Sequence, residues 1–141
     1  MARILAFDYG KKRIGVAVTD PLQMIANGLD TVSPQTVMNF IADYLAKEQV
    51  ELFVVGLPKT MRNEASESMQ YIEPFVQKLK AKYPNIPVEM FDERFTSVLA
   101  HQAIIEGGVK KKERRENKEL VDMVSATIIL QSFLESRRFR M

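Results

Sequence analysis

Three acidic residues stand where a folded chain could bring them together. Asp8 ends an apolar run that predicts a buried strand, Glu93 follows a later apolar run, and Asp122 lies in the last helical segment. Asp92 could take the place of Glu93. Catalytic groups in α/β sheets collect at the carboxyl ends of strands, and carboxylate oxygens suit Mg²⁺ or Mn²⁺. Because two-metal phosphodiester cleavage needs carboxylates that hold the ions roughly 3.5–4 Å apart, these acids predict a metal-dependent nuclease.

The loop after Asp8 supports a phosphate-bearing substrate. An ionised carboxylate at the end of a buried strand is costly unless it is paired or holds a metal. Gly10 favours the tight turn of a hairpin, and Lys11, Lys12 and Arg13 follow it directly. We therefore expect Lys11 and Arg13 to contact substrate phosphates beside Asp8.

Asp122 has two interpretations that spacing alone does not separate. The small residues Ser125 and Ala126 share its helix face and would let the helix approach the sheet closely, which would bring Asp122 towards Asp8. Alternatively, Asp122 lies in the first turn of its helix, where the helix dipole favours a carboxylate.

Two further side chains near the acids could serve the substrate or the fold. Arg94 could contact the scissile phosphate, or it could pair with Asp92. Tyr9 could stack on a base or ribose, although a tyrosine at a strand end usually packs against the core. Both interpretations stay open for each residue.

Four other polar residues predict structural roles. Asp20 precedes a proline at a strand end and predicts a turn. Thr96 and Ser97 predict helix caps rather than nucleophiles, because no base is evident near them. His101 is expected on the surface.

Composition narrows the chemistry. The chain has 141 residues, 46% of them hydrophobic and 27% charged, which predicts one soluble domain over residues 1–141. It has no cysteine and one histidine, so disulfides, zinc–thiolate sites and histidine clusters are excluded. No signal peptide or membrane-spanning apolar segment is evident, and we expect a cytoplasmic protein.

The chain has little excess positive charge, but its basic residues are clustered in the sequence. The net charge is only +2, but basic residues cluster at 11–13, 110–115 and 137–140. Such runs are usually solvated surface. The run that contains Lys110, Lys111 and Lys112 nevertheless suggests a mobile basic loop that contacts the substrate backbone.

The predicted elements alternate so as to give a mixed α/β sheet. A meander of three strands is followed by crossovers, so antiparallel pairing should give way to parallel strands flanked by helices on both faces. A turn is expected at Asn27-Gly28, an N-cap at Ser33, and a kink or boundary at Pro74. The expected elements are a hairpin over 4–20, a strand over 29–32, a helix opening at 33–34, a strand over 51–56, a helix over 65–83, a strand over 87–91, a helix from 96 or 97 to 107, a helix over 118–134 and a frayed tail over 136–141.

Five motifs together resemble a known family. They are Phe7-Asp8-Tyr9-Gly10, Gly15-Val16-Ala17, Val55-Gly56-Leu57-Pro58, Asp92-Glu93-Arg94-Phe95-Thr96-Ser97 and Asp122-Met123-Val124-Ser125-Ala126. In this order the chain resembles the YqgF (RuvX) family of pre-16S ribosomal RNA nucleases, also described as Holliday junction resolvases, over nearly its whole length. The resemblance implies a ribonuclease-H-like fold and an acidic site at Asp8, Glu93 and Asp122.

One position departs from the wider RuvC-like superfamily. Many of those nucleases carry an acid at the end of the fourth strand, where this chain has Gly56 and Leu57. The second acid must then come from Asp92 or Glu93 on the neighbouring strand. The number of metal ions therefore stays open.

Several functions remain in competition. The substrate could be structured RNA, such as a 16S ribosomal RNA precursor, or branched DNA, since readers of nucleic-acid shape leave little base-specific signature. A non-catalytic RNA-binding assembly factor would keep only the basic loops. A phosphate-binding ATPase of the actin and sugar-kinase type shares the Asp-x-Gly hairpin but needs two such domains. A monomer and a homodimer are equally compatible with the sequence.

Overall fold

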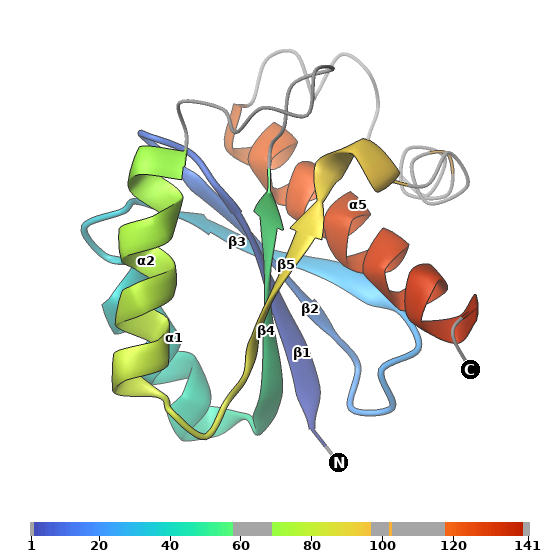
Figure 1. Cartoon of the computed structure of the whole chain (residues 1–141), viewed down its shortest axis with the longest axis horizontal. Coiled ribbons are helices and arrows are strands. Elements are labelled where there is room, and N and C mark those ends of the chain that lie inside the picture. Colours follow the sequence, from blue (N-terminus) through green and yellow to red (C-terminus); the bar gives the residue numbers. More distant parts are fainter. Residues whose placement is uncertain (1, 58–68, 97–101, 103–117, 140–141) are drawn as a thin grey trace.

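The computed structural model describes residues 2–57, 69–96, 102 and 118–139. A twisted five-stranded sheet runs through the middle of this part, with helices on both sides (Figure 1). The elements are β1 (Arg3–Tyr9), β2 (Ile14–Thr19), β3 (Ala26–Val32), α1 (Val37–Lys47), β4 (Val50–Leu57), α2 (Met69–Lys82), β5 (Val88–Asp92), the 3₁₀ turn η1 (Glu93–Phe95) and α5 (Lys118–Phe139).

The sheet has the predicted mixed topology. Its strand order is β3-β2-β1-β4-β5. The meander β1-β2-β3 pairs antiparallel, while β4 pairs parallel to β1 and β5 pairs parallel to β4. The carboxyl ends of β1, β4 and β5 therefore meet at one edge of the sheet, the upper edge in Figure 1.

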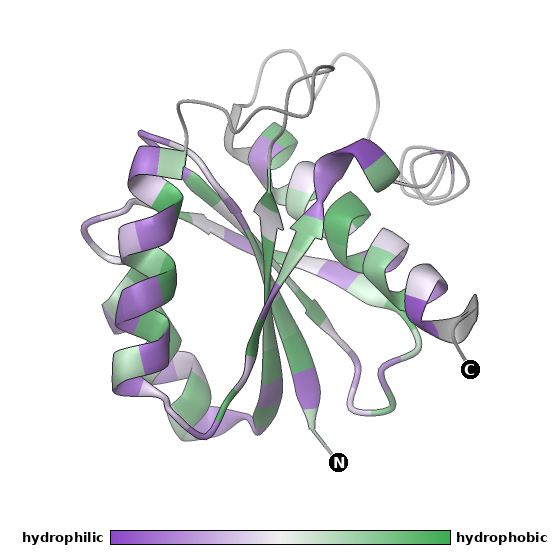
Figure 2. Ribbon diagram, in the orientation of Figure 1, coloured by the Kyte–Doolittle hydropathy of each residue, from purple (hydrophilic) through white to green (hydrophobic). Residues whose placement is uncertain are grey.

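The two faces of the sheet carry separate cores. Leu5 and Phe7 of β1 pack with α1 and α2, whereas Ile4 and Ala6 pack with α5. Because side chains alternate across a strand, Asp8 continues the face that α5 covers. Hydrophobic residues accordingly concentrate in the central strands and on the sides of the helices that face the sheet (Figure 2).

Glycines let α5 lie unusually close to its face of the sheet. A Cβ on Gly15 would overlap the Asp122 carbonyl oxygen of α5, and a Cβ on Gly28 would lie 2.7 Å from Cγ of Met123. Gly15 is the residue of β2 that pairs with Asp8. The backbone of α5 at Asp122 thus rests on the strand beside Asp8.

The expected turn at Asn27-Gly28 is wrong. Both residues belong to β3, where Gly28 pairs with Ala17 of β2. The contact with α5, and not a turn, accounts for the glycine. The chain reverses earlier, as Asp20 predicted, because its Oδ1 accepts hydrogen bonds from the backbone N–H groups of Met24 and Ile25, both 2.8 Å long.

Two helix ends differ from the prediction. The N-cap of α1 is Thr36 rather than Ser33. The backbone N–H of Thr36 donates to the Ser33 carbonyl over 3.1 Å, so Ser33 opens a turn that precedes the helix. The prediction of a frayed tail is wrong for the residues up to Phe139, because α5 continues to that residue. Within this stretch, Arg137 donates a hydrogen bond to Oε1 of Gln23 over 3.2 Å.

The remaining predictions are confirmed in part. Pro74 lies inside α2 and does not end it. Thr96 follows η1, and its hydroxyl donates to the Glu93 carbonyl over 3.1 Å. Of the predicted helix after Thr96 the structure describes only Gln102, which is helical; Ser97, His101 and the basic loop lie outside the described residues.

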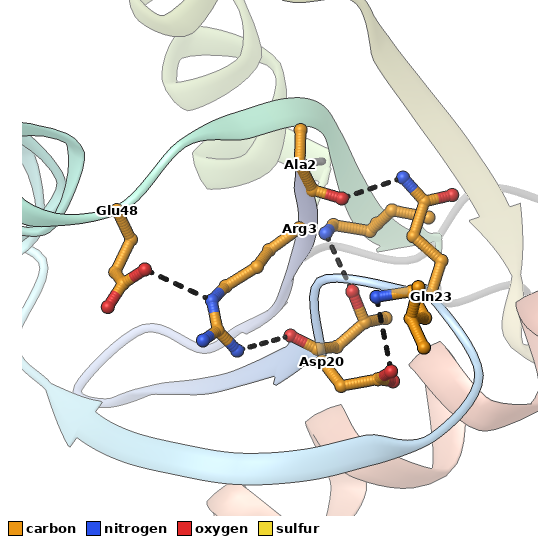
Figure 3. A network of polar contacts seen from close by, with 8 residues as sticks. Ala2, Arg3, Asp20, Gln23 and Glu48 are labelled. Carbon is orange, nitrogen blue, oxygen red and sulfur yellow. Dashed lines mark hydrogen bonds and ion pairs between the residues drawn. The ribbon is translucent and has the colours of Figure 1, made fainter.

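The edge of the sheet opposite the acids is held by a polar network (Figure 3). The Arg3 guanidinium donates to Glu48 over 3.3 Å and to the Thr19 carbonyl over 3.0 Å. The Thr19 hydroxyl accepts from the backbone N–H of Ile4 over 2.9 Å. These bonds fix the start of β1 to the end of β2, which sets the register that places Asp8 opposite Gly15. In the described part of the chain, no helix has the length and apolar character to cross a membrane.

Candidate active site

Asp8 is a partly buried carboxylate on the α5 side of the sheet. Its neighbours Ile4 and Ala6 on that face are fully buried, so little water reaches it from within the sheet. This burial, and next the negative charge of Asp122, raise the pKa of Asp8 from 3.8 to about 6.

Glu93 approaches Asp8 from the end of β5. The two side chains share a hydrogen bond. This bond lowers the pKa of Asp8 and raises the pKa of Glu93. Glu93 is therefore the donor and Asp8 the acceptor. Burial, followed by the charges of Asp8 and Asp92, raises the pKa of Glu93 from 4.5 to about 7. Both carboxyl groups therefore hold their protons to a higher pH than they would in water.

Gly56 leaves the room that Glu93 occupies. A Cβ at Gly56 would lie 3.4 Å from Oε1 of Glu93 and 2.7 Å from Cδ1 of Ile129. Gly56 pairs with Phe91, two residues before Glu93. The side chain of Glu93 thus lies over the end of β4, at the position where the wider superfamily was expected to carry its acid.

Asp122 lies on α5, and its carboxylate forms an ion pair with Arg13. Asp122 is the fifth residue of that helix, so the first-turn interpretation fails. Its Oδ2 accepts a hydrogen bond from Nε of Arg13 over 2.6 Å, in an ion pair whose side chains are 38% exposed at Arg13 and 23% at Asp122. Its charge still acts on Asp8.

The three predicted acids lie near one another, but each is engaged in one of two separate pairs. Asp8 and Glu93 form a carboxyl pair, and Asp122 forms an ion pair with Arg13. Within the described ranges, no three carboxylate or imidazole side chains are grouped closely enough to hold a metal ion together. The catalytic and metal-binding roles of Asp8, Glu93 and Asp122 stay predictions.

Of the predicted substrate-binding cations, Arg13 is the partner of Asp122 described above. The Arg94 guanidinium pairs with Asp92 over 2.6 Å, as its second interpretation had it. Lys11 is exposed, with Nζ 6.0 Å from the ring centroid of Tyr71. Lys110, Lys111 and Lys112 are beyond the described residues.

Tyr9 has a structural role. Its ring packs on Phe75 of α2 with centroids 4.9 Å apart, on the side of the sheet away from α5. It belongs to the core under α2, which favours the packing interpretation over base stacking.

The sequence analysis missed the two glycines that make the site possible. Gly15 admits the α5 backbone beside Asp8, and Gly56 admits the Glu93 side chain. A signal was available in the strand pattern, because Ala6 and Ala17 already mark one face of the sheet as lined by small residues. A glycine two residues along the same strand, as Gly15 is from Ala17, lies on the same face and predicts where a helix comes closest.

Comparison with known proteins gives consistent results. The sequence model of a family named RuvX and described as "Holliday junction resolvase" matches residues 2–136. A "Putative pre-16S rRNA nuclease" of Bacteroides thetaiotaomicron is 62% identical over 139 residues, covering 99% of this chain and 100% of the relative. A protein of the same name from Phocaeicola vulgatus is 63% identical over 139 residues and covers 99% of both chains.

A solved structure extends the comparison to the fold. The RuvC protein of T. thermophilus in complex with a Holliday junction substrate superposes with a TM-score of 0.60 at 16% identity, covering 98% of this chain and 96% of the other. At this identity the similarity concerns the fold alone. It confirms the predicted ribonuclease-H-like architecture.

Proposed function

Because the chain belongs to the RuvX family, we propose that it is a metal-dependent nuclease that hydrolyses phosphodiester bonds in structured RNA, specifically in the precursor of 16S ribosomal RNA. The names of the close relatives support the RNA substrate. The carboxyl groups at the sheet edge support the hydrolytic chemistry. Such a precursor is made and trimmed in the bacterial cytoplasm, where we expect the protein to act.

The observation that carries the proposal is the hydrogen-bonded contact between the carboxyl groups of Asp8 and Glu93 at the edge of the sheet. Two carboxyl groups in hydrogen-bond contact, partly removed from water, repel each other when both are ionised. The fold tolerates this arrangement although a pair of apolar residues would cost less. A divalent cation relieves that repulsion directly, and its preference for oxygen ligands fits this donor set. The site therefore has the chemistry of a Mg²⁺ or Mn²⁺ site.

Each acid has a distinct proposed task. Asp8 and Glu93 would hold the metal, and Asp122 would join them or orient a bound water once Arg13 releases it. When bound, a divalent ion lowers the pKa of a coordinated water and stabilises the charge on the leaving oxygen. Glu93 must give up its proton before it can ligate, so binding should strengthen as pH rises through about 7.

The cations around the acids are the proposed phosphate contacts. Lys11 lies three residues beyond Asp8 in the hairpin loop and reaches solvent. Arg13 and Arg94 would each exchange a carboxylate partner for a phosphate, which a guanidinium can bind through two parallel hydrogen bonds. Lysines 110, 111 and 112 are proposed to add backbone contacts.

Branched DNA is a second candidate substrate, and the comparisons give the reason. The description of the family model names Holliday junctions, and the RuvC protein of similar fold was solved with one bound. Branched DNA would use the same acids and the same cations. The active-site geometry favours neither substrate over the other.

One experiment tests the proposal and separates the substrates. Purified protein is incubated with a 16S precursor RNA or a four-way DNA junction, in Mg²⁺, Mn²⁺ or EDTA. We expect metal-dependent cleavage of the RNA that Asp8→Asn, Glu93→Gln and Asp122→Asn abolish and that Asp92→Asn reduces less. Cleavage of the junction alone would assign the second substrate. Binding of RNA without cleavage in any metal would instead identify an assembly factor.

A further inference from the structure

Phe95 is exposed beyond what the fold explains. Among the residues that the structure describes, it is the most exposed large hydrophobic side chain, at 69%. It is the last residue of η1 and follows Glu93 by two positions. Neither core cluster includes it. An exposed aromatic ring close in sequence to an acidic residue of the site offers a flat apolar face to a ligand.

The surroundings of the ring suit a nucleotide. The guanidinium carbon of Arg94 lies 5.6 Å from the ring centroid of Phe95. Arg94 is held there by Asp92, which accepts from its Nε over 3.1 Å and its Nη2 over 2.6 Å. A cation fixed against an aromatic ring presents charge and a stacking surface together, as proteins that bind single-stranded nucleic acid do.

A second aromatic–cation pair lies along the same edge of the sheet. Tyr71, 36% exposed, stands near the start of α2 with Nζ of Lys11 6.0 Å from its ring centroid. In Figure 1 the upper end of α2 and the turn η1 lie on opposite sides of the end of β4. The ends of α2 and β5 at this edge of the sheet thus each carry an exposed ring with its own cation.

We propose that Phe95 is a stacking platform for an unpaired nucleobase next to the scissile phosphate. The protein then cleaves where a base has left the stack, in a single-stranded or distorted segment, and not within a continuous duplex. This inference rests on the proposed nuclease function. It adds to that function the local structure of the substrate.

The sequence provides a direct reporter, since it has no tryptophan. The variant Phe95→Trp carries a single indole at the proposed platform. In EDTA, so that nothing is cleaved, we expect a single-stranded oligoribonucleotide to quench its fluorescence and a blunt-ended duplex of the same length to leave it unchanged. An oligodeoxyribonucleotide of the same sequence shows whether the base is taken from RNA only.

A matched control comes from Leu22, which is 58% exposed in the loop between β2 and β3. That loop lies at the opposite edge of the sheet (Figure 1). The variant Leu22→Trp should bind the same oligonucleotide without quenching. Equal quenching of both indoles would reflect collision with the nucleic acid and would overturn the proposal.

Affinity then tests the stacking itself. Loss of one stacked base corresponds to a roughly 5- to 140-fold weakening, and we expect this range for Phe95→Ala with a labelled single strand. Phe95→Leu keeps an apolar side chain without a π-face and should weaken binding nearly as much. Wild-type affinity in Phe95→Leu, or tight binding by Phe95→Trp without quenching, would overturn the stacking role while leaving the nuclease proposal intact. Absence of any nucleic-acid binding, together with absence of cleavage, would remove both.

Discussion

Replacing Asp8 by asparagine should stabilise the metal-free protein, and the gain should depend on pH in a defined direction. The folded-state pKa of Asp8, about 6, lies above the 3.8 of an unperturbed aspartate. The unfolded chain therefore loses its proton first as pH rises, and the wild-type protein loses stability between pH 3.8 and about 6. Asparagine carries no charge at any of these pH values, so the variant escapes that loss.

The magnitude follows from the same two pKa values. Each pH unit of difference corresponds to 1.36 kcal/mol, so ionising Asp8 in the fold costs about 3 kcal/mol. About 2 kcal/mol of this develops between pH 4.5 and pH 7.5, because part of the loss has already occurred at the lower value. The advantage of Asp8→Asn over wild type should grow by that amount across the interval.

Urea unfolding followed by circular dichroism, in EDTA at both pH values, measures this difference. Asp20 offers a control of opposite sign, because backbone N–H donors from Ile25, Met24 and Leu22 lower its pKa. A lowered pKa contributes stability that is present at neutral pH and lost on acidification. Because pH 4.5 and pH 7.5 both lie above the unperturbed value of 3.8, the cost of Asp20→Asn should be nearly the same at both, and it should shrink only as the pH falls below 3.8.

The reasoning fails if Asp8→Asn is less stable than wild type at pH 7.5, or if its advantage is the same at both pH values. Either result would mean that Asp8 is not a buried charge under repulsion. The argument for a metal site at this position would then lose its basis, whatever the cleavage assay shows.

Three further predictions test the metal, the packing and the basic loop. Mn²⁺ at about ten times its Kd should stabilise the wild-type protein by about 1.4 kcal/mol in thermal unfolding; the gain should be reduced or absent in Asp8→Asn, and equal shifts would indicate non-specific ions. Gly15→Ala should cost about 3 kcal/mol in urea unfolding and displace Asp122, since its Cβ meets helix backbone, whereas Gly28→Ala meets the flexible Met123 side chain and should cost less. Equal costs would show that α5 can yield. Neutralising the three lysines at 110–112 should lower the salt dependence of RNA binding by up to about 3 in slope; an unchanged slope would assign them to solvated surface.

The sequence predicted the sheet well where strand patterns were strong. The run that contains Phe7 and the run that contains Phe53 gave the central strands, and both side chains are fully buried. The face of the sheet on which Asp8 lies is known from the structure, where Ile4 and Ala6 pack with α5. The small residues of the last helix predicted its approach to the sheet, and Ala126 is indeed fully buried beneath it.

The predictions failed where a local signal competed with a distant partner. Asn27-Gly28 is a strong turn signal by itself, but the contact of Gly28 with Met123 determines its conformation. Ser33 followed by Pro34 likewise has the pattern of a helix start, yet the helix begins at Val37. The contact that decides the conformation of Gly28 lies outside any short sequence window, whereas Ser33 opens a turn whose hydrogen bond with Thr36 is local.

The pairing of Arg13 with Asp122 spans 109 positions and no local pattern announces it. The total charge of the site suggests a reason for this ion pair. The acids would carry three negative charges if all were ionised. The Arg13 guanidinium offsets one of them, and the raised pKa of Glu93, about 7, keeps that carboxyl group partly protonated at neutral pH. Two positive charges are what one divalent cation brings. In the proposed working site, a bound cation would therefore replace both the proton and the guanidinium, and Arg13 would be freed at the moment when a substrate phosphate needs a partner.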